Sequence, residues 1–128
     1  MFARIDKSKF PEVRVTFSDD IDETSFNDFL NEWRNLYRDK KYFSFVFDAT
    51  EMGFPPLSYC YLMVQFLQSM KSQKEHYLKN STIIIANDYI IYLLNLIFGI
   101  EKPVSDVKVI NNIGVILNEY KGAQINDS

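Results

Sequence analysis

The side chains that could do chemistry gather in one stretch of the sequence, VFDATEMGFPPLSYC, where Asp48 is followed by Ser58 and Cys60. A carboxylate near a hydroxyl or a thiol suggests nucleophilic catalysis, which also needs a base and a group that orients that base. The one histidine, His76, lies outside this stretch, and the sequence has no GxSxG motif. We therefore predict that the protein is not an enzyme. An enzyme that uses Asp48 with Ser58 or Cys60 is the last of three alternatives.

The sequence also contains no motif for binding a metal or a phosphate group. One histidine, one cysteine and scattered carboxylates give no spacing typical of metal ligands. The four glycines, at positions 53, 99, 114 and 122, form neither GxGxxG nor a P-loop. Cys60 lies between two tyrosines and fits a buried, inert thiol, while His76 fits an imidazole near a helix end. We predict no metal and no cofactor.

Length and composition indicate a single packed domain. The chain has 128 residues, of which 47% are hydrophobic and 16% aromatic. A chain of this length can bury a sizeable core without disulfides or a metal. We predict one domain over residues 1–121 and a frayed tail over residues 122–128.

Charge and hydropathy exclude two classes of partner. The formal net charge of −3 gives no basic footprint for nucleic acid or for an anionic membrane. The most apolar segment, residues 89–100, is too short to cross a bilayer, and the first ten residues lack the apolar core of a signal peptide. A single cysteine suits a reducing compartment. We predict a cytoplasmic protein without a nucleic-acid partner and without membrane insertion.

Hydrophobic periodicity predicts strands that alternate with helices. Strands are expected at residues 2–5, 13–17, 42–47, 82–86 and 107–110. Helices are expected at residues 22–40, 56–79 and 87–99, and from Asn111 or Asn112 through Tyr120. The continuous run at 42–47 is typical of a strand that is covered on both faces. The order predicts an α/β fold with a mixed, mostly parallel sheet of about five strands, an N-terminal antiparallel strand and about four helices.

In this order of elements, the stretch VFDATEMGFPPLSYC connects a strand to a helix. We call residues 48–58 the joint. Asp48 would end the strand, at the edge where open α/β sheets place ligand crevices. Its carboxylate is also of the type that accepts hydrogen bonds from the amides of Thr50 to Met52 in an Asx turn. Pro55 and Pro56 would start the next helix, with Ser58 in its first turn near free backbone amides.

Three segments resemble a STAS domain, the fold of anti-sigma factor antagonists and of the cytoplasmic tails of sulfate transporters. VRVTFSDDID is similar to the second strand of that family and the turn that follows it. FVFDATEMGFPPLSYCYLMVQFLQSMK is similar to its hydrophobic strand, aspartate, short loop and helix. NDYIIYLLNLIFGIEKPVSDVKV is similar to its late helix and last strand. The resemblance covers nearly the whole chain and implies a regulatory module that binds proteins.

The phosphorylation motif of that family, Asp-Ser-x-Gly-Leu, is degenerate in this chain. Alignment on Asp48 and Phe54 places Pro56 at the motif's aspartate and Leu57 at its phosphorylated serine. Ser58 follows one position late, while Tyr59 and Cys60 replace the motif's glycine and leucine. The resemblance thus implies the fold and a binding surface without the usual switch, and it leaves Ser58 as the candidate phosphorylation site.

A second resemblance, to the lipid-binding CRAL-TRIO core, rests on residues 45–88, with their strand, aspartate, long helix and following strand. That family adds a helical N-terminal region which this chain lacks. The alternative function is therefore a small-ligand or lipid carrier, whose cavity the abundant aromatic and aliphatic side chains would line.

The leading prediction is a non-enzymatic STAS-like module that binds a regulatory protein, kinase-like by resemblance, with a homodimer also possible. Its apolar side chains cannot all face inward from a tight turn, so part of the joint should be exposed. The predicted partner- or ligand-binding residues are Asp48, Thr50, Glu51, Phe54, Pro56, Leu57, Ser58, Tyr59 and Tyr61.

Overall fold

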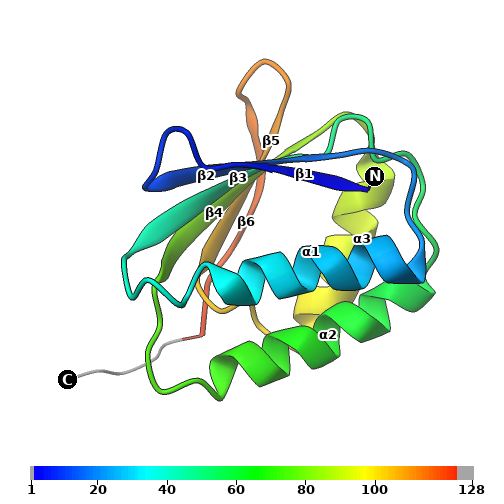
Figure 1. Ribbon diagram of the computed structural model, residues 1–128. Coiled ribbons are helices and arrows are strands. Elements are labelled where there is room, and N and C mark those ends of the chain that lie inside the picture. The colour runs from blue at the N-terminus through cyan, green and yellow to red at the C-terminus, as the bar shows by residue number, and fades with distance from the viewer. Residues whose placement is uncertain (1, 124–128) are drawn as a thin grey trace.

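The computed structural model describes residues 2–123 as one mixed sheet with helices packed against it (Figure 1). The strands are β1 (Ala3–Asp6), β2 (Glu12–Phe17), β3 (Phe43–Asp48), β4 (Leu78–Ile85), β5 (Asp106–Asn111) and β6 (Ile116–Tyr120). The helices are α1 (Glu23–Asn35), α2 (Ser58–Lys71) and α3 (Asp88–Ile100). The predicted α/β class is confirmed, with six strands where about five were expected and three helices where about four were expected.

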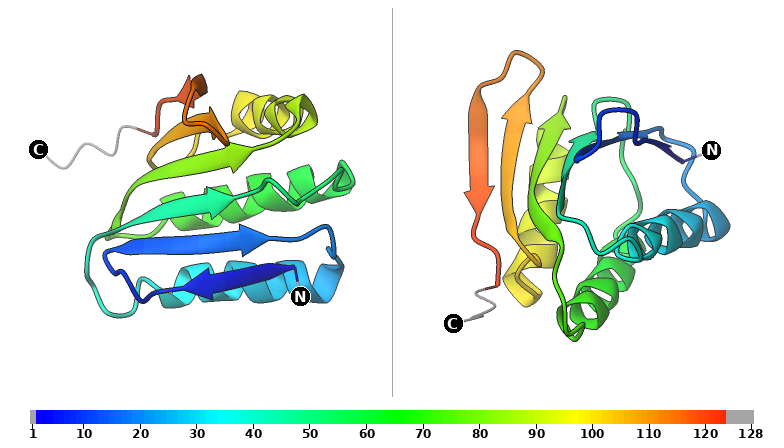
Figure 2. Two further views of the ribbon diagram at one scale, coloured as in Figure 1. Left: turned by 90° about the horizontal axis from the view of Figure 1, so that it is seen from above. Right: turned by 60° about the vertical axis from the view of Figure 1, so that its left-hand side comes forward.

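The strands lie in the sheet in the same order as in the sequence. Strands β2 to β5 are parallel, whereas β1 and β6 pair antiparallel at the two edges. Each parallel step moves in the same direction along the sheet, and crossovers are right-handed, so α1, α2 and α3 all lie on one face (Figure 2). Within residues 2–123, the opposite face of the sheet carries no helix.

Strand β3 shows the consequence of this one-sided arrangement. Phe43, Phe45 and Phe47 face the helices and are buried, while Ser44 and Val46 between them are only half-buried. The expectation that residues 42–47 form a strand covered on both faces is therefore wrong. The run looked continuous because Val46 is apolar although it lies on the uncovered face.

Helix α1 confirms the helix predicted within residues 22–40 and ends earlier, at Asn35. Asp22 caps it, because its carboxylate accepts a 2.7 Å hydrogen bond from the Ser25 amide and the Ser25 hydroxyl accepts one from the Asp22 amide. Trp33 is buried, and its ring centroid lies 4.9 Å from that of Phe45 on β3 and 4.9 Å from that of Phe66 on α2. This tryptophan therefore ties one helix to the sheet and to the neighbouring helix.

The predicted fourth helix, from Asn111 or Asn112 through Tyr120, is wrong, because this segment folds back as β6. The Asn111 side chain accepts hydrogen bonds from the amides of Ile113 and Val115, which closes a hairpin loop. Gly114 adopts a φ of 87°, a left-handed conformation that favours glycine. The turn chemistry of this asparagine and this glycine thus outweighs the helical spacing of the apolar residues.

Two boundaries also differ from the expectation. Helix α2 ends at Lys71, and β4 already begins at Leu78, so the expected helix at 56–79 was too long. Within the predicted tail, the Gly122 amide donates to the Asp106 carboxylate and the Ala123 amide to the Pro103 carbonyl. Residues 124–128 of the predicted frayed tail lie outside the described residues.

Candidate functional site

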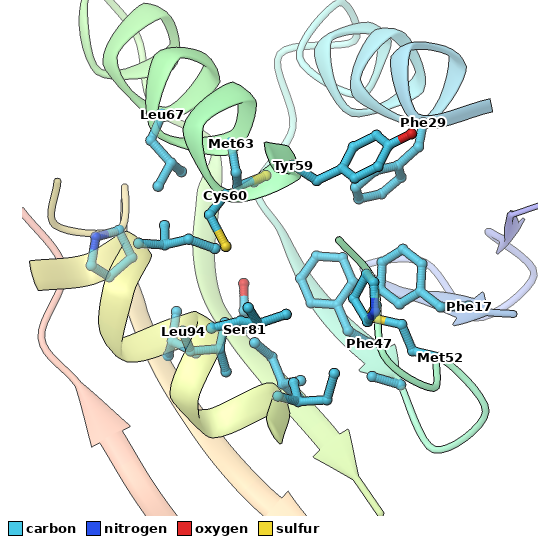
Figure 3. A pocket seen from close by; sticks show the side chains of 18 of the residues that line it. Phe17, Phe29, Phe47, Met52, Tyr59, Cys60, Met63, Leu67, Ser81 and Leu94 are labelled. Carbon is cyan, nitrogen blue, oxygen red and sulfur yellow. The ribbon is translucent and has the colours of Figure 1, made fainter. Parts of the chain in front are cut away.

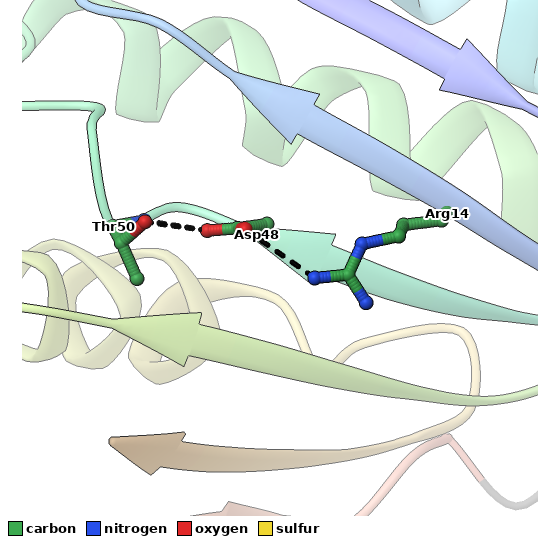
Figure 4. Close-up of polar contacts among 3 residues, drawn as sticks. All are labelled: Arg14, Asp48 and Thr50. Carbon is green, nitrogen blue, oxygen red and sulfur yellow. Dashed lines mark hydrogen bonds and ion pairs between the residues drawn. The ribbon is translucent and has the colours of Figure 1, made fainter. Parts of the chain in front are cut away.

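Asp48 ends β3 and fixes the start of the joint (Figure 4). Its Oδ1 accepts hydrogen bonds from the Thr50 amide at 3.1 Å and from the Thr50 hydroxyl at 2.7 Å. Its Oδ2 lies 3.3 Å from Nη2 of Arg14 on β2. The predicted Asx-type turn is thus present at Thr50, and an ion pair, which the sequence did not predict, joins two neighbouring strands.

The electrostatic surroundings keep Asp48 ionised. Partial burial by itself would raise the pKa of the Asp48 carboxyl, but the hydrogen bonds from Thr50 and the charge of Arg14 outweigh it and lower the pKa. A carboxylate with a lowered pKa and both oxygens occupied is a weak proton acceptor. Its role is to hold the turn.

The rest of the joint is held from α3. The Tyr89 hydroxyl donates a 2.9 Å hydrogen bond to the Pro55 carbonyl, and Asn87 Nδ2 donates one of 3.4 Å to the Gly53 carbonyl. The ring of Phe54 packs against the ring of Tyr89, with centroids 5.3 Å apart. Gly53 has a φ of 71°, so a residue with a side chain would be strained at this turn. The joint is therefore a fixed loop.

The joint leaves large apolar side chains in solvent. Phe54 is 74% exposed, Leu57 51% and Tyr61 66%, and Tyr92 of α3, beside Tyr89, is 51% exposed. We call Phe54, Leu57, Tyr61 and Tyr92 the joint surface. The expectation that part of the joint's apolar area is exposed is confirmed.

The side chain of Tyr59 points into the protein. It is half-buried, and its ring centroid lies 5.1 Å from that of Phe26 on α1. Among the predicted binding residues it therefore faces the interior, whereas Glu51, Pro56 and Ser58 are exposed and Asp48 and Thr50 are half-buried.

Three exposed acidic residues lie at the joint or beside it. Glu51 is exposed within the joint, and Asp88 is exposed at the start of α3, next to Tyr89. Asp19, also exposed, lies against Gly53, since a Cβ built on that glycine would be 3.4 Å from the Asp19 Cβ. These three carboxylates contribute negative charge beside the loop and the start of α3.

Ser58 is exposed as the first residue of α2. The amide of Tyr59 donates to the Pro56 carbonyl and the amide of Cys60 to the Leu57 carbonyl. The expectation of free amides near Ser58 is thus wrong for these two positions. A phosphate there would find fewer donors than an ordinary helix start offers.

The candidate nucleophiles are not assembled with a base. Cys60 faces the interior, and burial raises the pKa of its thiol, so the thiol stays protonated. Ser58 faces solvent on the same helix, and His76 lies beyond the other end of α2. The structure does not bring these three groups together.

Residues 2–123 lack two further features. Within them no group of three or more histidine, cysteine, aspartate or glutamate side chains is placed to hold a metal ion. None of the helices there has the length and apolar character needed to cross a membrane.

Comparison of the chain with models of protein families, with curated proteins and with solved structures gives no match.

Sequence reasoning missed the residues of α3 that support the joint. Asn87 begins the predicted third helix and occupies its N-cap, but its side chain makes no capping hydrogen bond and donates to Gly53 instead. Tyr89 and Tyr92 were expected to be only part of an apolar helix. Their three-residue spacing, with polar Asn87 and Asp88 before them, is the one signal that could have indicated an exposed aromatic face.

Proposed function

We propose that this protein is a non-enzymatic, STAS-like binding module of the cytoplasm whose joint surface captures a segment of a regulatory protein. The observation that carries the proposal is the exposure of Phe54, Leu57, Tyr61 and Tyr92 on a loop and two helices that are already fixed. Aromatic side chains of this kind are the usual anchors of protein interfaces.

The fixed geometry of the joint lowers the conformational entropy that is lost on binding. The hydrogen bonds from Tyr89 and Asn87 and the turn at Asp48 hold the loop before any partner arrives. A preorganised surface loses little conformational entropy on association, so more of the contact energy remains as affinity.

Charge around the joint surface favours one class of partner. Asp19, Glu51 and Asp88 would repel an acidic segment and attract a basic one. The partner we propose is therefore a peptide segment with aromatic or aliphatic anchors flanked by lysine or arginine.

The STAS-like part of the proposal is supported by the element order from β1 to β5 and by the strand, aspartate, loop and helix around the joint. The chain differs from the expected pattern after β5, where a strand replaces the last helix. With Leu57 at the position of the family's phosphorylated serine, we propose binding that is independent of the usual phosphorylation switch, and Ser58 as the residue to examine for modification.

Peptide display tests this function. A library of short random peptides would be selected on the whole protein and counter-selected on a Phe54→Ser/Tyr61→Ser variant. We expect the retained peptides to combine apolar anchors with basic residues, to lose about tenfold or more in affinity for the variant, and to bind less tightly at high salt.

The matched control is Phe10→Ser/Tyr42→Ser, which removes two exposed rings, 41% and 59% exposed, from elsewhere on the surface. This control should bind the selected peptides like the unmodified protein. Peptides that bind all three proteins equally would contradict the proposed surface, as would a selection that enriches none.

A further inference from the structure

A cavity of about 160 Å³ lies inside the protein, between the helices and the sheet. Figure 3 shows side chains of α2, α3 and β4 pointing toward one another across it, among them Cys60, Met63, Ser81 and Leu94. Phe47 of β3 and Met52 of the joint line the same space. Protein interiors are otherwise packed with few voids larger than a water molecule, so a space of this size needs an explanation.

The lining is mainly apolar, and its polar groups are the hydroxyls of Ser81, Ser105 and Tyr59 and the indole N–H of Trp33. Of the residues 2–123, no charged side chain lines the cavity. The hydroxyl of buried Ser81 points into it, toward the sulfur of Cys60 (Figure 3). Ser105 also lines the cavity, and its buried Oγ has no hydrogen-bond partner among the described residues. An unpaired buried hydroxyl costs free energy unless a bound group satisfies it.

The volume limits what can enter. An apolar cavity of about 150 Å³ stays dry and takes up benzene or xenon, whereas pockets for drug-sized ligands have about 300–1,000 Å³. At about 160 Å³ the present cavity suits a single ring or a short chain. A two-chain lipid does not fit in it.

We propose that this cavity is a binding site for a small neutral apolar molecule of about single-ring size, with one hydrogen-bonding group that reaches Ser81 or Ser105. The site does not depend on the proposed protein partner. Ionised ligands are excluded because the cavity offers no countercharge, and removing an ion from water costs several kcal/mol.

Residues of the joint and of the first turns of α2 take part in the lining of the cavity. Met52 and Met63 line the cavity and are half-buried, so each contacts both the interior and the surface. Both side chains are unbranched and flexible, which suits them to move aside for a ligand and to close over it. Pro55, Pro56 and Tyr59 also line the cavity, so a bound molecule contacts the inner side of the segment whose outer side carries the joint surface.

The methionine methyl groups offer a direct test with the whole protein. Met52 and Met63 line the cavity, whereas Met70 is buried at 1% exposure and does not line it. Methionine [13C]methyl NMR spectra would be recorded during titration with benzene and, separately, with phenol. We expect saturable shifts at Met52 and Met63 and no comparable shift at Met70.

Variants that fill the space complete the test. Cys60→Phe and, independently, Met63→Phe place a ring inside the cavity and should abolish the saturable shift at Met52, while Cys60→Ser should keep it. An unchanged Met70 resonance shows that a variant is folded. The proposal is overturned if no saturable shift occurs, if Met70 shifts equally, or if folded filled variants bind as well as the unmodified protein.

The hydrogen-bonding part has its own comparison. In a Ser81→Ala/Ser105→Ala variant the affinity for phenol should fall by about tenfold, in line with the loss of a buried hydrogen bond, while the affinity for benzene stays the same. Equal changes in the affinities for phenol and benzene would show that the two serines do not hydrogen-bond to the ligand.

Discussion

Strand β3 has two faces with opposite surroundings. Phe43, Phe45 and Phe47 pack under the helices with at most 6% of each residue exposed. Ser44, Val46 and Asp48 alternate with them on the face that no helix covers. The same backbone, with the same hydrogen bonds to its neighbours, thus carries a dry aromatic layer on one side and a partly solvated polar one on the other.

The difference shows where stability and solubility reside. On the covered face the rings contact one another at centroid distances of 4.5 to 5.3 Å along β3, so removing one leaves a hole that its neighbours cannot close. On the uncovered face, the ion pair between Asp48 and Arg14 stays partly in water and joins β3 to β2. Substitutions on the two faces should therefore differ in size and in their dependence on pH and salt.

The largest effect is expected from Phe45→Ala on the covered face. Phe45 is 1% exposed, and its loss should lower the free energy of unfolding by about 3–5 kcal/mol, as for other large-to-small core substitutions. Urea unfolding followed by tryptophan fluorescence measures it. The neighbouring Ser44→Ala on the uncovered face is the matched control and should change the value by less than about 0.5 kcal/mol. Similar losses of unfolding free energy in both variants would contradict the difference between the two faces of β3.

A smaller, pH-dependent effect is expected from Asp48→Ala. Losing the hydrogen bonds from Thr50 should cost about 1 kcal/mol at neutral pH. Because the pKa of folded Asp48 is lowered, its charge stabilises the fold above the ordinary pKa of 3.8, and this contribution disappears as the pH falls through the lower folded value. Urea unfolding at neutral and at acidic pH measures the free energy of unfolding of both proteins. The difference between wild type and variant should become smaller in acid. A gap that widens in acid would contradict the lowered pKa.

The smallest effect is expected from Lys121→Ala. Its amino group lies 3.8 Å from the Asp106 carboxylate, but the two side chains are 92% and 61% exposed. Pairs this exposed often contribute nothing measurable, so the thermal midpoint should stay within error at low and at high salt. A salt-sensitive loss of stability would mean that the sheet edge is less solvated than the structure indicates.

Local rules predicted much of this fold and part of the site. The helix α1 and the turn at Asp48 each depend on residues within a few positions of one another. Such features follow from backbone geometry and side-chain reach, which sequence displays directly. The expectation that some of the apolar side chains here are exposed came from a similarly local argument about the tight turn, and Phe54, Leu57 and Tyr61 are the exposed ones.

The missed features depend on partners far apart in the chain. Arg14 and Asp48 are separated by 34 positions, as are Tyr89 and Pro55, and only the parallel sheet brings each pair together. The cavity likewise needs β4, α2 and α3 in place before Ser81 and Cys60 can face one another. The spacing of apolar residues along the chain does not reveal a cavity that forms between several helices and strands.

By itself, the sequence determined the α/β class, the alternation of elements up to β5 and the exposed apolar joint, because hydrophobic period and turn residues act over short distances. Only the tertiary structure decided that the last segment is a strand, that all three helices lie on one face, and that Tyr59 faces inward while Tyr61 faces solvent. These outcomes depend on which neighbours each segment has, and neighbours are set by the packing of the whole chain.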